Sequence, residues 1–159
     1  MNTFADFAVS THLPLATIGM RLLVAALLGA AIGIDREWRS RPAGLRTHML
    51  TALAAALFTV LAFEIVNSDL LMHENTRADP IRVIEAVTAG VAFLAAGTII
   101  RGRGGVHGLT TGAGMWLAGS LGVASGLGYI AVAAIAAAFG VVIISLLGQI
   151  ERAMQHPDN

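Results

Sequence analysis

The chain has 159 residues, of which 56% are hydrophobic and 13% charged, and its ten acidic and ten basic residues give a formal net charge of zero. This composition is too apolar for an ordinary water-soluble domain, so we expect a protein integrated in a membrane. The chain has no cysteine, which excludes disulfide bonds, thiolate metal sites and cysteine nucleophiles. All ten basic residues are arginine, and they gather between long apolar runs.

Five apolar stretches approach the length of about 20 residues that a helix needs to cross a bilayer. In chain order they are residues 15–34, 45–65, 81–100, 109–126 and 128–148, and a short tail follows at 151–159. They predict an all-α fold: a polytopic helical bundle of five transmembrane helices, built from two similar hairpins, in one domain over residues 1–150. The first twenty residues include no basic residue, which argues against a cleaved signal peptide.

Arginines near the ends of the spans predict the orientation, because such residues are held on the cytoplasmic side. In a five-span chain, seven of them share one side: Arg36, Arg39, Arg41, Arg46, Arg101, Arg103 and Arg152. Arg77 and Arg82 fall on the other side, beside an acidic loop. We therefore expect the N-terminus outside and the C-terminus in the cytosol. A four-span alternative, in which the last two stretches form a re-entrant pair, would place Arg152 outside.

Small residues recur where helices are expected to meet. Two turns re-enter the membrane through related sequences, GLRT at 44–47 and GLTT at 108–111. Glycines four residues apart allow helices to approach to backbone contact, and they occur as the pairs Gly29/Gly33, Gly108/Gly112 and Gly122/Gly126. The turn at 126–128 has no charged residue, so its backbone groups need partners from neighbouring helices, since lipid offers none.

Two charged residues fall deep inside predicted spans. At 1.5 Å per residue, Arg21 lies roughly 20 Å from the cytosolic edge and Glu85 roughly 22 Å. A charge at this depth costs several kcal/mol unless it is paired, so the matching depths predict an intramembrane polar pair. The alternative is an arginine that snorkels towards the interface and a glutamate near its helix start. Glu64 is either a third member of this group or an interfacial charge.

A second candidate site, the cytosolic-edge layer, consists of Asp35, Arg46, Thr47, His48, His107, Thr110 and Thr111. Asp35 ends one helix and Arg46 opens the next, which predicts a bidentate ion pair. The threonines are expected to cap backbone amides at the helix starts. Simple stapling of the two hairpins is the alternative to a functional site. We expect activity to depend on this layer rather than on the outer loop.

Other motifs carry weaker signals. The outer loop has acidic and histidine side chains suited to a hard divalent cation, and a solvated loop is the alternative reading of Asp69, His73, Glu74 and Asp79. The turn at 101–105 lacks the lysine and hydroxyl residue of a phosphate-binding loop, which favours a basic turn near lipid headgroups. No span has histidines at metal-ligand spacing or a serine beside a base. We expect no enzyme activity, no catalytic or metal-ligating residue and no cofactor, with Mg²⁺ as the one unproven candidate.

Taken together, these residues resemble the MgtC/SapB family of bacterial inner-membrane proteins over nearly the whole chain. The matches are Arg21, GIDRE at 33–37, GLRTH at 44–48, FLAAG at 93–97, GLTT at 108–111 with Trp116, and the glycines between 122 and 128. The chain departs from the family pattern at Asp35, where glutamate is usual, and at Ala92 and Ala95, where glycines are typical. It resembles a short form without the soluble C-terminal domain of some members.

The resemblance implies a multi-pass inner-membrane accessory or regulatory protein linked to growth at low magnesium, and to virulence through survival inside macrophages. It also implies that the partners are other inner-membrane proteins, such as the proton-driven ATP synthase or magnesium transporters. Membrane lipids and a second copy of the chain are further expected partners, and nucleic acid is not. Two alternatives stay open: a small magnesium or proton transporter or channel with Arg21 and Glu85 as its polar midline, and a purely structural dimer-former.

Overall fold

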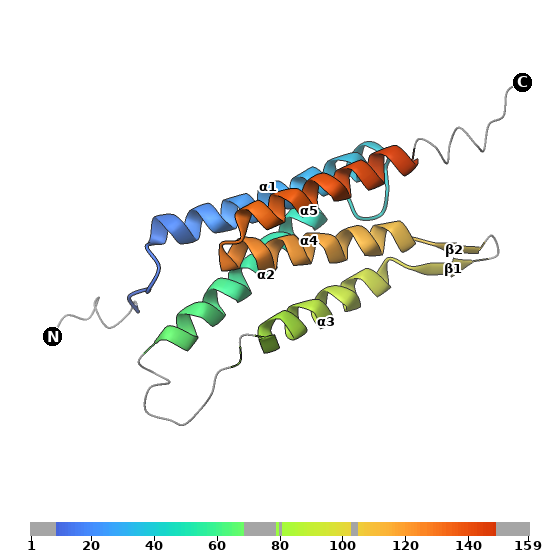
Figure 1. Ribbon diagram of the computed structural model, residues 1–159. Helices are drawn as coiled ribbons and strands as arrows, with labels where there is room; N and C mark the ends of the chain where they lie inside the picture. Colours follow the sequence, from blue (N-terminus) through green and yellow to red (C-terminus); the bar gives the residue numbers. More distant parts are fainter. Residues whose placement is uncertain (1–8, 69–78, 80, 103–104, 149–159) are drawn as a thin grey trace, which may run out of the picture.

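The computed structural model describes residues 9–68, 79, 81–102 and 105–148. Within these ranges the chain forms five α-helices that lie side by side (Figure 1). They are α1 (Leu15–Trp38), α2 (Leu45–Asn67), α3 (Ile81–Gly97), α4 (Leu109–Leu127) and α5 (Ile130–Val142), and a π-helical turn, η1 (Ile143–Leu147), continues α5. The predicted all-α helical bundle is confirmed.

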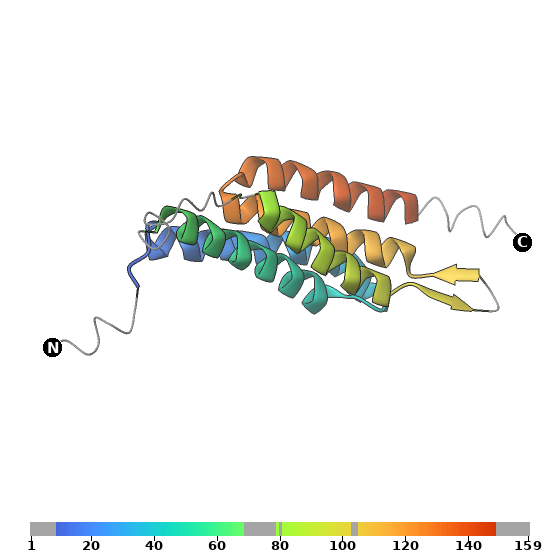
Figure 2. The ribbon, with the colours of Figure 1, turned by 90° about the horizontal axis from the view of Figure 1, so that it is seen from below.

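Successive helices run in opposite directions, and α4 lies at the centre, where it packs against all four of the others (Figures 1 and 2). One end of the bundle therefore holds the end of α1, the starts of α2 and α4, and the end of α5. We call it the arginine-rich end, because Arg36, Arg39, Arg41, Arg46 and Arg101 belong to it. By length and hydropathy, α1 and α2 qualify as candidate membrane spans among the described residues. The count of five spans stays a prediction.

The connection between α3 and α4 differs from the helical hairpin turn that the sequence suggested. Here α3 ends at Gly97, and the chain forms a two-stranded antiparallel hairpin from β1 (Ile100–Gly102) and β2 (Gly105–His107). The hairpin extends beyond the helices (Figure 2). β-Branched residues flank a glycine-rich turn here, and that combination favours paired strands over a continued helix.

Glycines bring the helices into backbone contact, as their spacing predicted. A Cβ atom placed on Gly29 would lie 2.6 Å from the carbonyl oxygen of His48, and one on Gly126 would lie 2.7 Å from that of Ala56. Neither distance leaves room for a methyl group, so α1 and α4 both pack directly on the α2 backbone. The interior between α1, α4 and α5 is filled by an apolar cluster of Ile32, Leu121, Ala133 and Ala137.

Candidate functional site

Arg21 holds the turn between α4 and α5. Its Nη1 donates a hydrogen bond of 2.8 Å to the carbonyl oxygen of Gly126, in the last turn of α4. Gly128 continues the turn in the left-handed region, with φ of 89°, and its N–H donates to the carbonyl of Ser125. A helix end inside a membrane needs such partners for its carbonyl groups. Arg21 is one of the partners that the uncharged turn was expected to require.

The predicted ion pair between Arg21 and Glu85 does not form. Glu85 is exposed on α3, and α3 packs against α4 and α2 rather than against α1. The depth estimate gives the height of each residue along the bundle but not the direction in which its helix face points. Glu64 instead accepts hydrogen bonds from the backbone N–H groups of His12, at 2.6 Å, and Leu13, at 3.0 Å, just before α1.

The predicted pair between Asp35 and Arg46 does not form either. Asp35 pairs at 2.7 Å with Arg39, the residue that directly follows α1, because side chains four residues apart share a helix face. Arg46 is exposed at the start of α2. The cytosolic-edge layer is therefore held together by different contacts from those that its residue types suggested.

The central contact at the arginine-rich end joins Arg36 to Thr111. Arg36 is only 6% exposed and Thr111 only 1%, and Nη2 of the arginine donates a hydrogen bond to the threonine hydroxyl. The Nε of Arg36 is buried and has no hydrogen-bond partner in the part of the chain that the structure describes. The sequence pattern predicts Arg36 only as one of the arginines that flank the spans on the cytosolic side. Its position seven residues after Gly29 and three after Gly33 places it on the packed face of α1, a signal that could have identified it.

His48 is fully buried where α1, α2 and α4 meet. Its Nδ1–H donates to the carbonyl oxygen of Gly44 at 2.8 Å, and its Nε2 points at Gly114, where an added Cβ would lie 3.0 Å away. The side chain thus fills the space that Gly114 leaves open. His48 belongs to the predicted layer, and its role here is packing between helices.

The threonines do not cap the helices as predicted. The backbone N–H of Leu45 at the start of α2 donates to Glu37 at 2.9 Å, and α4 begins at Gly108 with no side-chain cap. Thr47 contributes its carbonyl oxygen, which accepts a hydrogen bond from the Thr51 hydroxyl. Glycine, rather than threonine, occupies both N-cap positions. Gly108 has a left-handed φ of 90°, and an added Cβ there would collide with the carbonyl oxygen of Thr98, whereas a Cβ on Gly44 would collide with the Glu37 carboxylate.

Two grooves open on the surface. The arginine groove, at the arginine-rich end, has a volume of about 1040 Å³ and is lined by α1, β2, the start of α4 and the end of the α5–η1 helix. Its polar residues are Asp35, Arg36, Arg39, Arg41, His107, Thr110 and Thr111. Three members of the predicted layer besides Asp35 therefore line one groove, whereas Arg46, Thr47 and His48 lie outside its lining.

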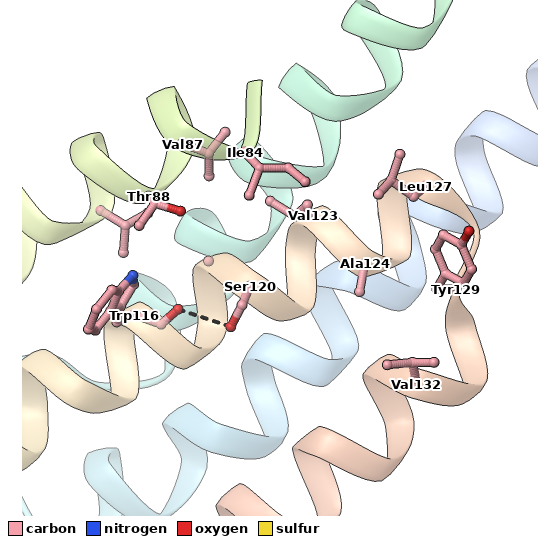
Figure 3. A pocket seen from close by; sticks show the side chains of 12 residues that line it. Ile84, Val87, Thr88, Trp116, Ser120, Val123, Ala124, Leu127, Tyr129 and Val132 are labelled. Atoms are coloured by element: carbon pink, nitrogen blue, oxygen red, sulfur yellow. Dashed lines mark hydrogen bonds between the residues drawn. The ribbon is translucent and has the colours of Figure 1, made fainter. Parts of the chain in front are cut away.

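The apolar groove lies between α3, α4 and α5, over the half of α4 that ends at Leu127, and has a volume of about 250 Å³. Figure 3 shows Ser120 and Ala124 of α4 between Thr88 of α3 and Val132 of α5. Trp116 and Tyr129, both more than half exposed, lie at its two ends. Sequence reasoning did not identify this groove, because it depends on the angle between helices that are not adjacent in the chain.

Some predicted residues lie outside the described ranges: Asp69, His73, Glu74, Arg77, Arg103 and Arg152. Asp79 is described, and its carboxylate accepts a 2.9 Å hydrogen bond from the N–H of Ile81 at the start of α3. Among the described residues, no group of three or more histidine or acidic side chains is placed to hold a metal ion.

The sequence model of the MgtC family matches residues 22–153. The chain belongs to the MgtC family. The matched segment includes Arg36, Thr111 and both grooves, so the features described above are part of the family domain. Together with the two long apolar helices α1 and α2, this membership identifies an MgtC-like membrane protein.

Curated relatives agree with the assignment. Protein MgtC of Brucella abortus is 39% identical over 134 residues, which cover 84% of this chain and 52% of that protein. The putative magnesium transporter YhiD of Escherichia coli is 37% identical over 109 residues, which cover 69% of this chain and 50% of that protein. An uncharacterized Haemophilus influenzae protein is 32% identical over 133 residues, covering 83% of this chain and 56% of that protein. The chain thus spans about half the length of these relatives, and no solved structure matches it.

Proposed function

We propose that this protein is a non-enzymatic accessory or regulatory protein of the bacterial inner membrane, which acts in adaptation to low magnesium by contact with membrane partner proteins. Its N-terminus is periplasmic and its arginine-rich end cytosolic in this proposal. The observation that carries the proposal is the apolar groove between α3 and α5, whose floor is a face of α4 with small side chains.

The groove has the features of a seat for a transmembrane helix. On one side of α4, Gly122 and Gly126 already hold α2 in backbone contact. On the groove side, Ser120 and Ala124 repeat the spacing of four residues, which lets membrane helices pack closely. The face of α4 that points towards α2 is covered by α2, and the face that points towards the groove is open. A helix of a partner protein would therefore find on α4 the same kind of surface that α2 uses.

The packing of the interior also supports an accessory role over an ion pathway. The cluster around Leu121 and Ala137 fills the space between α1, α4 and α5 with apolar side chains. Arg21, which would be the positive half of a polar midline, is bonded to the backbone of Gly126. Arg36, the buried charged side chain of the described residues, lies at the arginine-rich end, and the hydroxyls of Thr51 and Thr59 in α2 each donate to a backbone carbonyl oxygen four residues earlier.

Filling the groove tests this proposal. Replacing Ser120 and Ala124 together with leucine should abolish rescue of a low-magnesium growth defect, because the added side chains would occupy the space for the partner helix. Ala134→Leu is the matched control, since Ala134 is exposed on α5 and does not line the groove. All variants must reach the membrane in equal amounts. Full rescue by the groove-filled variant would contradict the proposal that a partner helix binds in the apolar groove.

A second candidate is a small magnesium or proton transporter. The observation that favours it is the name of the E. coli relative, a putative magnesium transporter. Mg²⁺ would then be the transported ion rather than a bound cofactor. The accessory proposal includes a role in virulence through survival in macrophages. It also includes contact with the ATP synthase, with magnesium transporters or with a second copy of the chain, and each of these partners would bind to the outer surface of the bundle.

A further inference from the structure

The arginine groove has an excess of positive charge beside exposed apolar residues. Arg36, Arg39 and Arg41 line it from α1 and the following turn, and Asp35 is the one acidic residue in the lining. Asp35 pairs with Arg39 at 2.7 Å, and among the described residues no carboxylate lies within ion-pair distance of Arg36 or Arg41. The groove therefore suits a negatively charged ligand.

Arg36 is the observation that distinguishes this groove from an ordinary basic surface. The side chain is 94% buried, since only 6% of it is exposed, and its single bonded partner in the described ranges is the neutral hydroxyl of Thr111. Burying a charge costs several kcal/mol unless an opposite charge or several hydrogen bonds compensate. The buried Nε has no acceptor there. A bound anion next to Arg36 would provide the missing charge.

The start of α4 adds backbone donors at the same place. Gly108 has a φ of 90°, no side chain caps the helix, and Thr110 and Thr111 line the groove. The first N–H groups of a helix have no acceptor within the helix and carry a partial positive charge. Hydroxyl and backbone donors beside guanidinium groups are the groups that bind phosphate.

The apolar side of the groove indicates where the phosphate comes from. Trp38, Leu109 and Ile143 also line it, and their side chains are 81%, 60% and 56% exposed. Free phosphate gains nothing from contact with an apolar surface, whereas the acyl chains of a lipid would bury apolar area against it. The groove also lies at the end of α1, a candidate membrane span, which is the level of the lipid headgroups. Its volume of about 1040 Å³ is at the upper end of ligand sites, which reach about 1,000 Å³.

We propose that the arginine groove binds an anionic phospholipid, with the lipid phosphate held by Arg36, Arg41 and the first turn of α4, and the acyl chains lying on Leu109 and Ile143. Basic pockets between helices on the cytoplasmic side bind anionic headgroups in this way. This inference does not rest on the accessory function, because it concerns binding by the purified protein alone.

Native mass spectrometry of the purified full chain tests the inference, with phosphatidylglycerol, phosphatidylcholine of the same acyl chains, and inorganic phosphate as three separate ligands. Wild type should bind phosphatidylglycerol at least tenfold more tightly than phosphatidylcholine. Arg36→Gln and Arg41→Gln should each weaken phosphatidylglycerol binding about tenfold, as expected for one lost charged hydrogen bond of about 1.4 kcal/mol. Arg46→Gln is the matched control and should change nothing, since this exposed arginine lies at the same end but outside the groove.

Three results would overturn the inference. Equal binding of the two lipids would remove the charge preference, and an equal loss in Arg46→Gln would mean that general surface charge attracts the lipid. Inorganic phosphate that binds as tightly as phosphatidylglycerol would refute the lipid as the ligand. Arg41→Gln keeps the test valid if Arg36→Gln does not fold, because Arg41 is exposed and its side chain has no partner among the described residues.

Discussion

Gly29→Ala should disrupt the contact between α1 and α2 on which the bundle depends. The new Cβ would lie 2.6 Å from the carbonyl oxygen of His48 and 2.9 Å from the Cβ of Ala52. Ordinary contact begins near 3.4 Å, so α2 must move by about 0.8 Å (3.4 minus 2.6) at one point. The α2 backbone cannot shift at one residue without moving the neighbouring turns of the helix. Overpacking of this kind costs about 1–3 kcal/mol, and two contacts place the expected cost at the upper end, about 2–3 kcal/mol.

Gly19→Ala is the matched control, because Gly19 lies in the same helix and a Cβ there would meet nothing within 4 Å. That change should be neutral or should stabilise by up to about 1 kcal/mol through helix propensity. The assay is unfolding of the purified protein in detergent, followed by the fluorescence of Trp38 and Trp116. Gly29→Ala should lower the midpoint clearly and Gly19→Ala should not. Equal midpoints for the two variants would refute the close packing of α1 on α2.

Three further predictions follow from the site. Arg21→Gln should destabilise the protein by about 1–3 kcal/mol by leaving a carbonyl of the α4–α5 turn unpaired, and adding Glu85→Gln should not restore the detergent midpoint; recovery in the double variant would show that the two residues meet. Glu37→Ala should cost about 1 kcal/mol in the same assay, since it removes the acceptor for the first amide of α2, and an unchanged midpoint would refute that cap. In intact spheroplasts, an impermeant thiol reagent should label Ser68→Cys and spare Ser40→Cys, and the reverse pattern would invert the topology.

Hydropathy and residue spacing predicted the bundle because both are local properties of the chain. The five apolar runs became helices, and the glycine spacing at Gly29 and Gly126 marks real backbone contacts. The hairpin after α3 was missed because the apolar run of α3 continues to Ile100, and hydropathy alone does not separate a short strand from the end of a helix. The choice there depends on the glycines of the turn.

Pairings within the site could not be predicted in the same way. The sequence placed Asp35 and Thr111 at the same end of the bundle, and they do line one groove. It did not show that Asp35 turns to Arg39 or that Arg36 turns inwards to Thr111. Which side chains meet depends on how each helix is rotated about its own axis. That rotation is set by packing against neighbours that are distant in the sequence.

Ion flux through the purified protein tests the accessory proposal most directly. The full chain is reconstituted in liposomes that contain a magnesium-sensitive or a pH-sensitive dye, and a gradient of Mg²⁺ or protons is applied. The account predicts a flux equal to that of empty liposomes. The same wild-type protein must rescue growth at low magnesium in cells, which shows that it is functional. A saturable flux of either ion above that of empty liposomes would contradict it, and would show that an ion pathway runs through the bundle.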